Sequence, residues 1–181
     1  MGNFKEREMS YKVYKDEFPT SPREEGDNLG IMICFHKRYN LGDRHDYKFT
    51  DFSSWEDMEY FLSEGAKVIL PLYLYDHSGL SISTEPFSCP WDSGQVGFII
   101  ATEESIKRCM GWKRITKNRL EAIKTYLIGE VETYNQYLNG EVYAWTTFDE
   151  QGNELDSCYR HYCEGHAIED AKENLKYHGQ A

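Results

Sequence analysis

The clearest pattern of apolar positions lies in the second half of the chain. Apolar residues recur there at spacings of three and four, namely Leu120, Ile123, Leu127, Val131, Tyr134 and Leu138. Side chains at these spacings are neighbours on one face of an α-helix. The pattern therefore predicts a long amphipathic helix that ends at Gly140.

Shorter helices are predicted from capping signals. Ser53 and Glu56 have the spacing of a capping box ahead of an apolar stripe, so a helix is expected over residues 53–65. Thr102 can cap a second helix, because the acidic residues that follow it favour the positive end of a helix. A terminal helix is predicted over residues 166–178, with Ile168, Ala171 and Leu175 on one side.

Runs of apolar and aromatic residues between these helices have the length of β-strands. Residues 28–36 form a nearly continuous apolar run, which is typical of a central strand covered on both faces. Pro71 lacks an N–H group, so its strand is expected to have a bulge or an edge there. The predicted strands are 11–14, 28–36, 67–75, 95–101, 141–148 and 154–162, the last two joined as a hairpin by the turn-rich residues 149–153.

The order of these elements predicts an α+β fold, with an antiparallel or mixed β-sheet and helices packed on one face. A chain of 181 residues with 40% hydrophobic residues can bury a sizeable core in one domain. We expect that domain over residues 28–181, preceded by a loosely ordered segment, 1–27, with an edge strand at 11–14.

Composition and cysteine usage indicate an intracellular protein. No stretch approaches the roughly 20 apolar residues needed to cross a bilayer, and the N-terminus lacks the apolar region of a signal peptide. The cysteines number five, an odd count that suits reduced thiols better than a disulfide framework. We therefore expect a cytoplasmic protein that makes no membrane contact.

Charge is distributed unevenly along the chain. The formal net charge of −11 disfavours a general nucleic-acid coat, whose affinity comes from basic surface. Surface charge mostly serves solubility, yet a basic segment could meet phosphates and an acidic one a basic protein groove. The basic residues in question are Lys107, Arg108, Lys113, Arg114, Lys117 and Arg119. The acidic residues are Glu130, Glu132, Glu141, Asp149, Glu150, Glu154 and Asp156.

The segment 76–95 is the candidate for chemistry, because a long ordered loop between strands is usually functional. In one interpretation Cys89 is a nucleophile, His77 its base, and Asp76 or Asp92 the orienting carboxylate. In another, His77 acts with His36 or His45 as the acid and base of a metal-independent ribonuclease. A purely structural loop, ordered by packing of Phe87 and Trp91 and by turn hydrogen bonds, is the third.

Metal and cofactor signals are weak. Cys158, His161, Cys163 and His166 lie close together, but strand alternation would place Cys158 and His161 on opposite faces, and the spacing matches no common zinc motif. Residues 42–46 offer at most a weak hydrated Mg²⁺ contact. No phosphate-binding or dinucleotide-binding glycine pattern occurs. We therefore expect neither a dedicated metal site nor a cofactor.

Three segments, 27–43, 70–79 and 86–97, carry a family resemblance, most specifically at Pro90-Trp91-Asp92-Ser93-Gly94-Gln95. Over roughly residues 27–163 the chain resembles small acidic proteins encoded by phages and mobile elements of Gram-positive bacteria. The resemblance implies a counter-defence protein in the host cytoplasm, most simply an anti-CRISPR protein directed at a type II RNA-guided nuclease.

Two mechanisms of inhibition are open. The acidic stretch 130–156 could occupy the basic nucleic-acid channel of the nuclease. Alternatively, the basic segment 107–119 could hold guide RNA while the loop 76–95 cuts it. The other interpretations are a small cysteine-dependent or histidine-dependent hydrolase, and a phage accessory protein without enzymatic activity.

Overall fold

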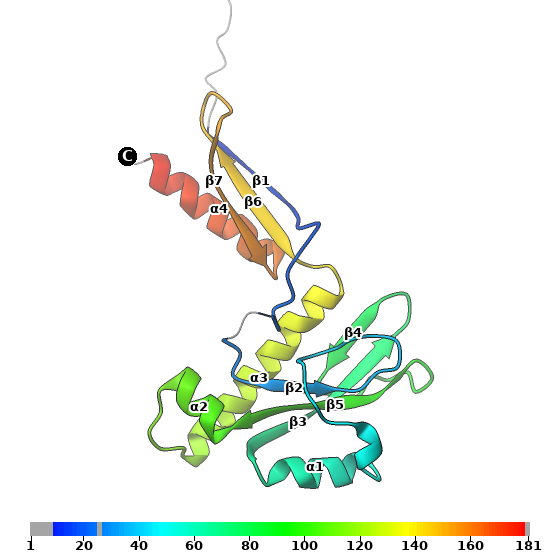
Figure 1. Ribbon diagram of the computed structural model, residues 1–181. Coiled ribbons are helices and arrows are strands. Elements are labelled where there is room, and N and C mark those ends of the chain that lie inside the picture. Colours follow the sequence, from blue (N-terminus) through cyan, green and yellow to red (C-terminus); the bar gives the residue numbers. More distant parts are fainter. Residues whose placement is uncertain (1–8, 25–26, 180–181) are drawn as a thin grey trace, which may run out of the picture. The chain divides into compact units, whose positions relative to one another are not determined.

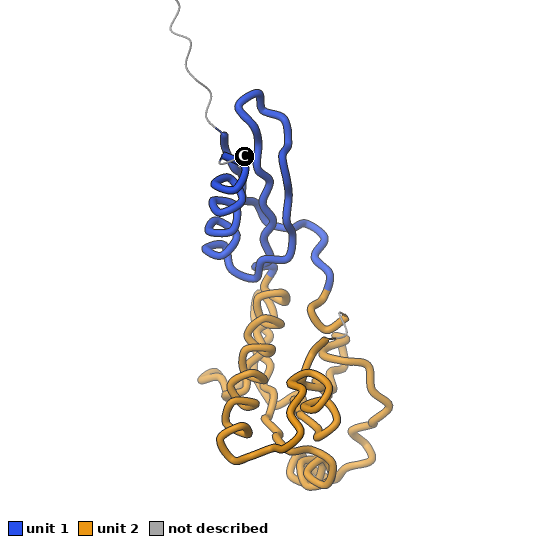
Figure 2. The backbone as a smooth tube through the Cα atoms, turned by 90° about the vertical axis from the view of Figure 1, so that its left-hand side faces the viewer, with its two compact units in different colours: residues 1–20, 140–181 blue, residues 21–139 orange. Residues whose placement is uncertain are grey.

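The computed structural model describes residues 9–24 and 27–179, and the chain divides into two compact units (Figure 2). The larger unit spans residues 21–139, and the smaller unit combines residues up to 20 with residues from 140 onward. The smaller unit is therefore assembled from both ends of the chain.

These boundaries differ from the predicted boundary near residue 27. The single domain expected over residues 28–181 stays a prediction, since two compact units can still unfold together. The loose order expected for residues 1–27 falls in part on residues 1–8 and 25–26, which lie outside the described residues.

The larger unit is built on a four-stranded antiparallel sheet in the order β2-β5-β3-β4 (Figure 1). Its strands are β2 (Ile31–Cys34), β3 (Ala66–Asp76), β4 (Leu80–Ser83) and β5 (Ser93–Thr102). Its helices are the short 3-10 turn η1 (Phe49–Asp51), α1 (Trp55–Ser63), α2 (Glu103–Met110) and α3 (Lys117–Leu138).

Helices α3 and α1 pack on opposite faces of this sheet (Figure 1). On one face Ile99 of β5 packs with Ile123 and Leu127 of α3. On the other face the neighbouring residue Phe98 packs with Met58 of α1, because successive side chains of a strand point to opposite faces. The stripe predicted for the long helix is confirmed, and both faces of this sheet are covered.

Strand β2 lies at the edge of the sheet, so its predicted central position is wrong. Its outer edge is covered by the following loop instead of by another strand. The carboxylate of Asp43 accepts a hydrogen bond from Met32 N at 2.8 Å, and Asp43 N donates to Met32 O at 2.9 Å. The apolar run predicted burial correctly, because β2 is covered on both faces, but it could not specify the strand's neighbours.

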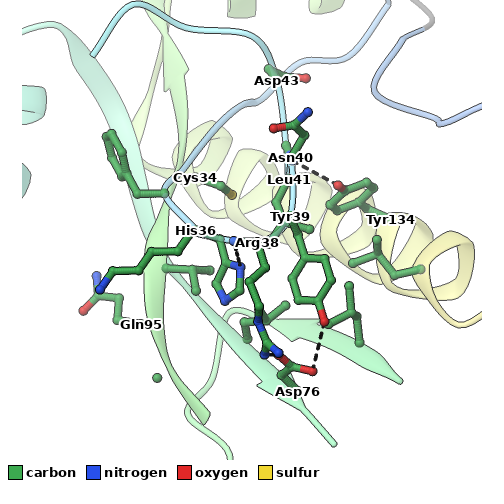
Figure 3. Close-up of a pocket in the computed structure, with 18 of the residues that line it drawn as sticks. Cys34, His36, Arg38, Tyr39, Asn40, Leu41, Asp43, Asp76, Gln95 and Tyr134 are labelled. Carbon is green, nitrogen blue, oxygen red and sulfur yellow. Dashed lines mark hydrogen bonds and ion pairs between the residues drawn. The ribbon is translucent and has the colours of Figure 1, made fainter. Parts of the chain in front are cut away.

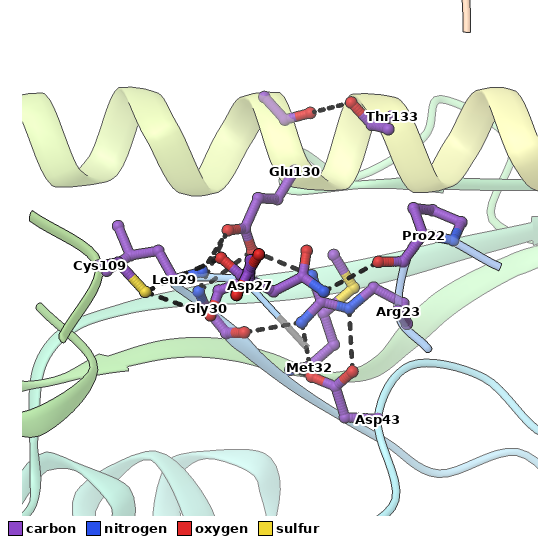
Figure 4. Close-up of polar contacts among 12 residues, drawn as sticks. Pro22, Arg23, Asp27, Leu29, Gly30, Met32, Asp43, Cys109, Glu130 and Thr133 are labelled. Carbon is purple, nitrogen blue, oxygen red and sulfur yellow. Dashed lines mark hydrogen bonds and ion pairs between the residues drawn. The ribbon is translucent and has the colours of Figure 1, made fainter. Parts of the chain in front are cut away.

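A network of largely buried charged groups joins β2 to α3 in the larger unit (Figure 4). The guanidinium of Arg23 binds Asp43 at 2.6 Å and Glu130 at 3.0 Å. Glu130 also accepts the backbone N–H of Leu29 at 2.6 Å. Burial alone lowers the pKa of Arg23, but the hydrogen bonds and charges of Asp43 and Glu130 outweigh it, and the pKa is raised. The arginine therefore stays charged.

The segment 76–95 is not one long loop, because Leu80–Ser83 forms β4 and pairs with the end of β3. The predicted strand around Pro71 is confirmed as part of β3. Strand β4 pairs with β3 only from Tyr73 onward, so Pro71 has a strand neighbour on one side only, as expected for a residue without an N–H.

The observed helix caps agree largely with those predicted from the sequence. Thr102 caps α2 in a capping box with Ser105, and Gly111 ends the helix in the left-handed conformation at φ 64°. The cap of α1 is Ser54 and not Ser53, since the Ser54 side chain accepts from the backbone N–H of Asp57. Ser53 instead donates to the Asp57 carboxylate.

The smaller unit is a three-stranded antiparallel sheet in the order β1-β6-β7, packed against one helix. Its elements are β1 (Ser10–Lys15), β6 (Tyr143–Phe148), β7 (Glu154–His161) and α4 (Glu164–Gly179). The predicted edge strand, hairpin and terminal helix are thereby confirmed. Trp145 packs with Ala167 and Ala171 in a small core.

Strand β7 contains a bulge near its end. Trp145 pairs with Cys158 and Tyr143 with His161, so three residue steps on β7 face two on β6. Arg160, inside the bulge, has a positive φ of 70°. The extra residue returns His161 to the face that carries Cys158, and the expectation that the two side chains point to opposite faces is wrong.

The α+β class is confirmed, with antiparallel pairing in both sheets. Among the described residues, no helix has the length and apolar character needed to span a bilayer.

Candidate functional site

Most of the candidate catalytic residues meet at one place in the larger unit. An open depression of about 1950 Å³ lies between the loop that follows β2 and the segment that leads into β5. His36, Asp76 and Asp92 line it, and His77 and Cys89 both contact Asp92. The structure thus brings together residues up to 56 positions apart in the sequence.

The loop after β2 supplies one wall of the depression. His36 stacks on Tyr39 with ring centroids 4.8 Å apart, and its Nδ1 accepts the backbone N–H of Arg38 at 3.2 Å. Arg38 forms an ion pair with Asp76, whose other oxygen lies 3.5 Å from the Tyr39 hydroxyl (Figure 3). The carboxylate of Asp76 is therefore held by the Arg38 guanidinium and the Tyr39 hydroxyl.

The opposite wall is held by backbone pairing. Asp76 N donates to Asp92 O at 2.8 Å, which fixes the end of β3 against the segment before β5. Ser78 supplies the tight turn into β4 with a positive φ of 59°. His77 lies between Asp76 and Ser78 in the chain. Its side chain is beside Asp92, with Nδ1 3.2 Å from Asp92 Oδ2.

The geometry does not form the thiol triad that the sequence suggested. Cys89 Sγ lies 3.9 Å from Asp92 Oδ2, the same oxygen that contacts His77, so the carboxylate is the partner that the thiol and the imidazole share. A nucleophilic triad has the imidazole in the middle, hydrogen-bonded to both partners. The pair His77–Asp92 alone has the arrangement of a general base, since a carboxylate at Nδ1 leaves Nε2 to accept a proton.

Trp91 differs from the expectation for an ordered structural loop. Its side chain is 91% exposed, so it does not pack to stabilise the segment. Phe87 does pack, with its ring 5.6 Å from that of Tyr75. An exposed tryptophan at the rim of a depression offers apolar area to a ligand or partner.

His45 and Cys34 have local structural partners. His45 Nε2 lies 3.0 Å from the carbonyl oxygen of Cys34, and its ring contacts that of Phe35 at 5.0 Å. Burial, and then the charge of Asp43, raises the pKa of the Cys34 thiol to about 12. Cys34 is therefore a neutral thiol at physiological pH.

The basic segment 107–119 is exposed on the loop between α2 and α3 and on the adjoining helix ends, with part of its charge engaged locally. Lys107 pairs with Glu103 at 2.7 Å, and the Arg119 guanidinium lies 4.6 Å from the ring centre of Trp112. Arg108 donates to the backbone oxygen of Asn28. The exposed side chains of the segment include Lys113, Arg114 and Lys117.

The acidic residues are divided between the two units. Glu130 is buried in the network with Arg23, and Asp149 accepts the backbone N–H groups of Gln151 and Asn153 inside a turn. Asp156 accepts from Asn174 at 2.8 Å. Asp156 is nevertheless exposed, as are the remaining members of the set, namely Glu132, Glu141, Glu150 and Glu154.

Sequence reasoning missed Arg38 and Tyr39 as partners of Asp76. Both lie within the segment 27–43, one of those on which the expected family resemblance is based. Comparison of the chain with protein-family models, with curated proteins and with solved structures found no match.

Proposed function

We propose that this protein is a phage or mobile-element counter-defence protein that inhibits a type II RNA-guided nuclease by occupying its nucleic-acid channel. The observation that supports this proposal is the charge of the hairpin β6–β7. Glu150 in its turn and Glu154 and Asp156 on β7 are all exposed. The channel that holds a guide–target duplex is positively charged, so a compact acidic hairpin has complementary charge.

The placement of the other charged groups favours occlusion over guide capture. Lys107, Arg108 and Arg119 of the basic segment are engaged with neighbours, which reduces the cations presented to a phosphate backbone. The hairpin carboxylates of Glu150 and Glu154 are exposed, so a basic surface can approach them directly.

The test combines the purified protein with a type II RNA-guided nuclease, guide RNA and target DNA. DNA cleavage is followed on one gel and guide integrity on a denaturing gel. Occlusion predicts blocked DNA cleavage with an intact guide. A shortened guide would instead indicate a ribonuclease, and unaffected cleavage across nucleases from several Gram-positive hosts would refute the proposal.

A pair of charge variants makes this test specific for the hairpin. Glu150→Gln/Glu154→Gln should weaken inhibition, and more so at low salt, because screening already reduces the charge attraction at high salt. The matched control is Glu169→Gln/Glu173→Gln, which removes the same charge from exposed positions of α4. Equal loss in both variants would show that net charge, and not the hairpin, is responsible.

The His77–Asp92 pair favours a second candidate function, a metal-independent ribonuclease or other hydrolase at the depression. In this mechanism Asp92 orients the imidazole, and His77 Nε2 removes a proton from water or from a ribose hydroxyl. His77→Ala would then lower the cleavage rate by about 10²–10⁴-fold.

Cys89→Ser separates the two enzymatic mechanisms. It should leave a reaction based on His77 and Asp92 intact, whereas a thiol nucleophile would be lost. Circular dichroism of each variant distinguishes loss of chemistry from loss of folding. Substrates are guide RNA and a panel of peptide amides.

A further inference from the structure

Three potential metal ligands converge in the smaller unit. The Sγ of Cys158, a ring nitrogen of His161 and a carboxylate oxygen of Asp170 all lie within 4.8 Å of one another. No other cluster of this kind occurs in the part of the chain that the structure describes. The three residues come from two elements, because Cys158 and His161 are on β7 and Asp170 is on α4.

The bulge in β7 creates this cluster. In a regular strand, residues three apart point to opposite faces. The additional residue between Cys158 and His161, with Arg160 at φ 70°, reverses that relation and directs both side chains to α4. Bulges commonly re-aim a side chain at a functional position.

The imidazole of His161 has a nitrogen that its protein neighbours leave unsatisfied. Nε2 is buried and makes no hydrogen bond with any described residue, although it lies only 3.4 Å from Asp170 Oδ2. Two ligands at about 2.1 Å from a tetrahedral zinc ion are about 3.4 Å apart. The separation of the nitrogen and the oxygen therefore fits two ligands that share one ion.

The carboxylate of Asp170 is held in place by a hydrogen bond from a tryptophan of the core. Trp145 Nε1, in the small core, donates to Asp170 Oδ2 at 2.9 Å. Metal ligands in proteins are commonly oriented by such hydrogen bonds, and their loss weakens metal binding. The tryptophan fixes the carboxylate on the side of α4 that faces β7.

The donor set is specific for a class of ion. One thiolate, one imidazole and one carboxylate match the sulfur, nitrogen and oxygen ligands of Zn²⁺, whereas Mg²⁺ and Ca²⁺ prefer oxygen alone. We propose that Cys158, His161 and Asp170 bind a zinc-class transition-metal ion, with the fourth coordination position open to water or to a ligand. Binding would release the thiol proton and join the end of β7 to α4.

The first test measures Zn²⁺ binding to the full chain by calorimetry, with Co²⁺ as a spectroscopic probe. We expect one ion per chain, a thiolate-to-cobalt charge-transfer band, and the intense visible bands of tetrahedral cobalt. A higher melting temperature with Zn²⁺ should accompany binding. Absence of saturable binding, or a cobalt spectrum without the thiolate band, would overturn the proposal.

Variants identify the ligands. Asp170→Asn and Cys158→Ser, which preserve side-chain size, should each weaken Zn²⁺ binding at least about tenfold, and Trp145→Phe should weaken it about 10–100-fold. The controls are Cys163→Ser and His166→Ala, because these potential ligands lie nearby in the sequence but outside the cluster. Unchanged affinity in the controls supports the proposed set, and loss in either control with retention in Asp170→Asn would refute it.

This inference is independent of the proposed nuclease inhibition. It is measured on the isolated protein with the metal alone, so its failure would leave the channel-occlusion proposal unchanged.

Discussion

At the scale of single residues, the larger unit contains a network of largely buried charges. Only 3% of the Arg23 side chain is exposed, and its guanidinium contacts two carboxylates and the backbone oxygen of Gly30. Removing one partner from such a buried network leaves the other charges uncompensated. Arg23 should therefore be among the most sensitive positions of the chain.

Replacing Arg23 with methionine should lower the free energy of unfolding by about 3–5 kcal/mol, because Asp43 and Glu130 would lose their shared cation. The control is Arg38→Met, which removes another arginine–aspartate pair. The Arg38 side chain is 66% exposed, so its loss should cost less than about 1 kcal/mol. Urea unfolding of both variants checks the difference, and equal costs would contradict the assigned importance of burial.

The buried thiol of Cys34 should make the free energy of unfolding fall at alkaline pH. Its pKa in the folded protein is raised from 9.0 to about 12, so the unfolded chain releases the thiol proton at a lower pH than the folded one. Between these values the unfolded state binds fewer protons, and the free energy of unfolding falls as pH rises, by up to about 1.4 kcal/mol per pH unit.

Cys34→Ala should remove this contribution and make the stability curve shallower above pH 9 than in the natural sequence. Its control, Cys109→Ala, alters an exposed thiol and should leave the slope unchanged. Chemical unfolding at a series of pH values provides the measurement, and parallel curves for all three proteins would count against a buried neutral thiol.

At the scale of elements, β5 is packed so closely that it tolerates no side chain at one position. A Cβ atom on Gly97 would lie 1.9 Å from the carbonyl oxygen of Ile33 in β2. The contact is with backbone, which cannot rotate away. The register of the two strands therefore requires glycine there.

Gly97→Ala should destabilise the larger unit by about 1–3 kcal/mol or more, since the strands must separate to admit the methyl group. Gly94 provides a control in the same strand, because a Cβ there would have no atom within 4 Å. Gly94→Ala should be neutral or stabilising by up to about 1 kcal/mol. Thermal unfolding compares the two, and similar losses would indicate a general effect of the strand instead of this contact.

At the scale of the whole molecule, the two units differ in the size of their cores. The larger unit has extensive buried clusters on both faces of its sheet. The smaller unit has one small buried cluster, formed by Trp145, Ala167 and Ala171. Small cores supply little stability and commonly require a metal or another support.

The isolated segment 21–139 should therefore fold by itself, with the circular dichroism of a mixed α/β protein and a cooperative thermal transition. Arg23 is included in this segment, so its ion-pair network stays complete. A fragment that fails to fold would support the single domain predicted from the sequence, because the units would then depend on each other.

Local patterns predicted most of the elements of this fold. The α3 stripe, the Thr102 cap and the β6–β7 hairpin each depend on residues a few positions apart, and each is confirmed. His36, Asp76 and Asp92, which the sequence suggested as catalytic residues, line one depression, and their catalytic role stays a prediction. The relation of Cys89 to His77 was not predictable, since proximity in sequence does not fix which group each side chain contacts.

The sequence by itself determined where most helices and strands form, though not β4, because these follow from side-chain periodicity and from hydrogen bonds between near neighbours. Only the tertiary structure decided that β2 is an edge strand, that Glu130 is buried against Arg23 107 residues away, and that a bulge turns His161 toward Asp170. These features depend on register and on distant partners. A one-residue shift in register reverses the face of every following side chain, and no local pattern records that shift.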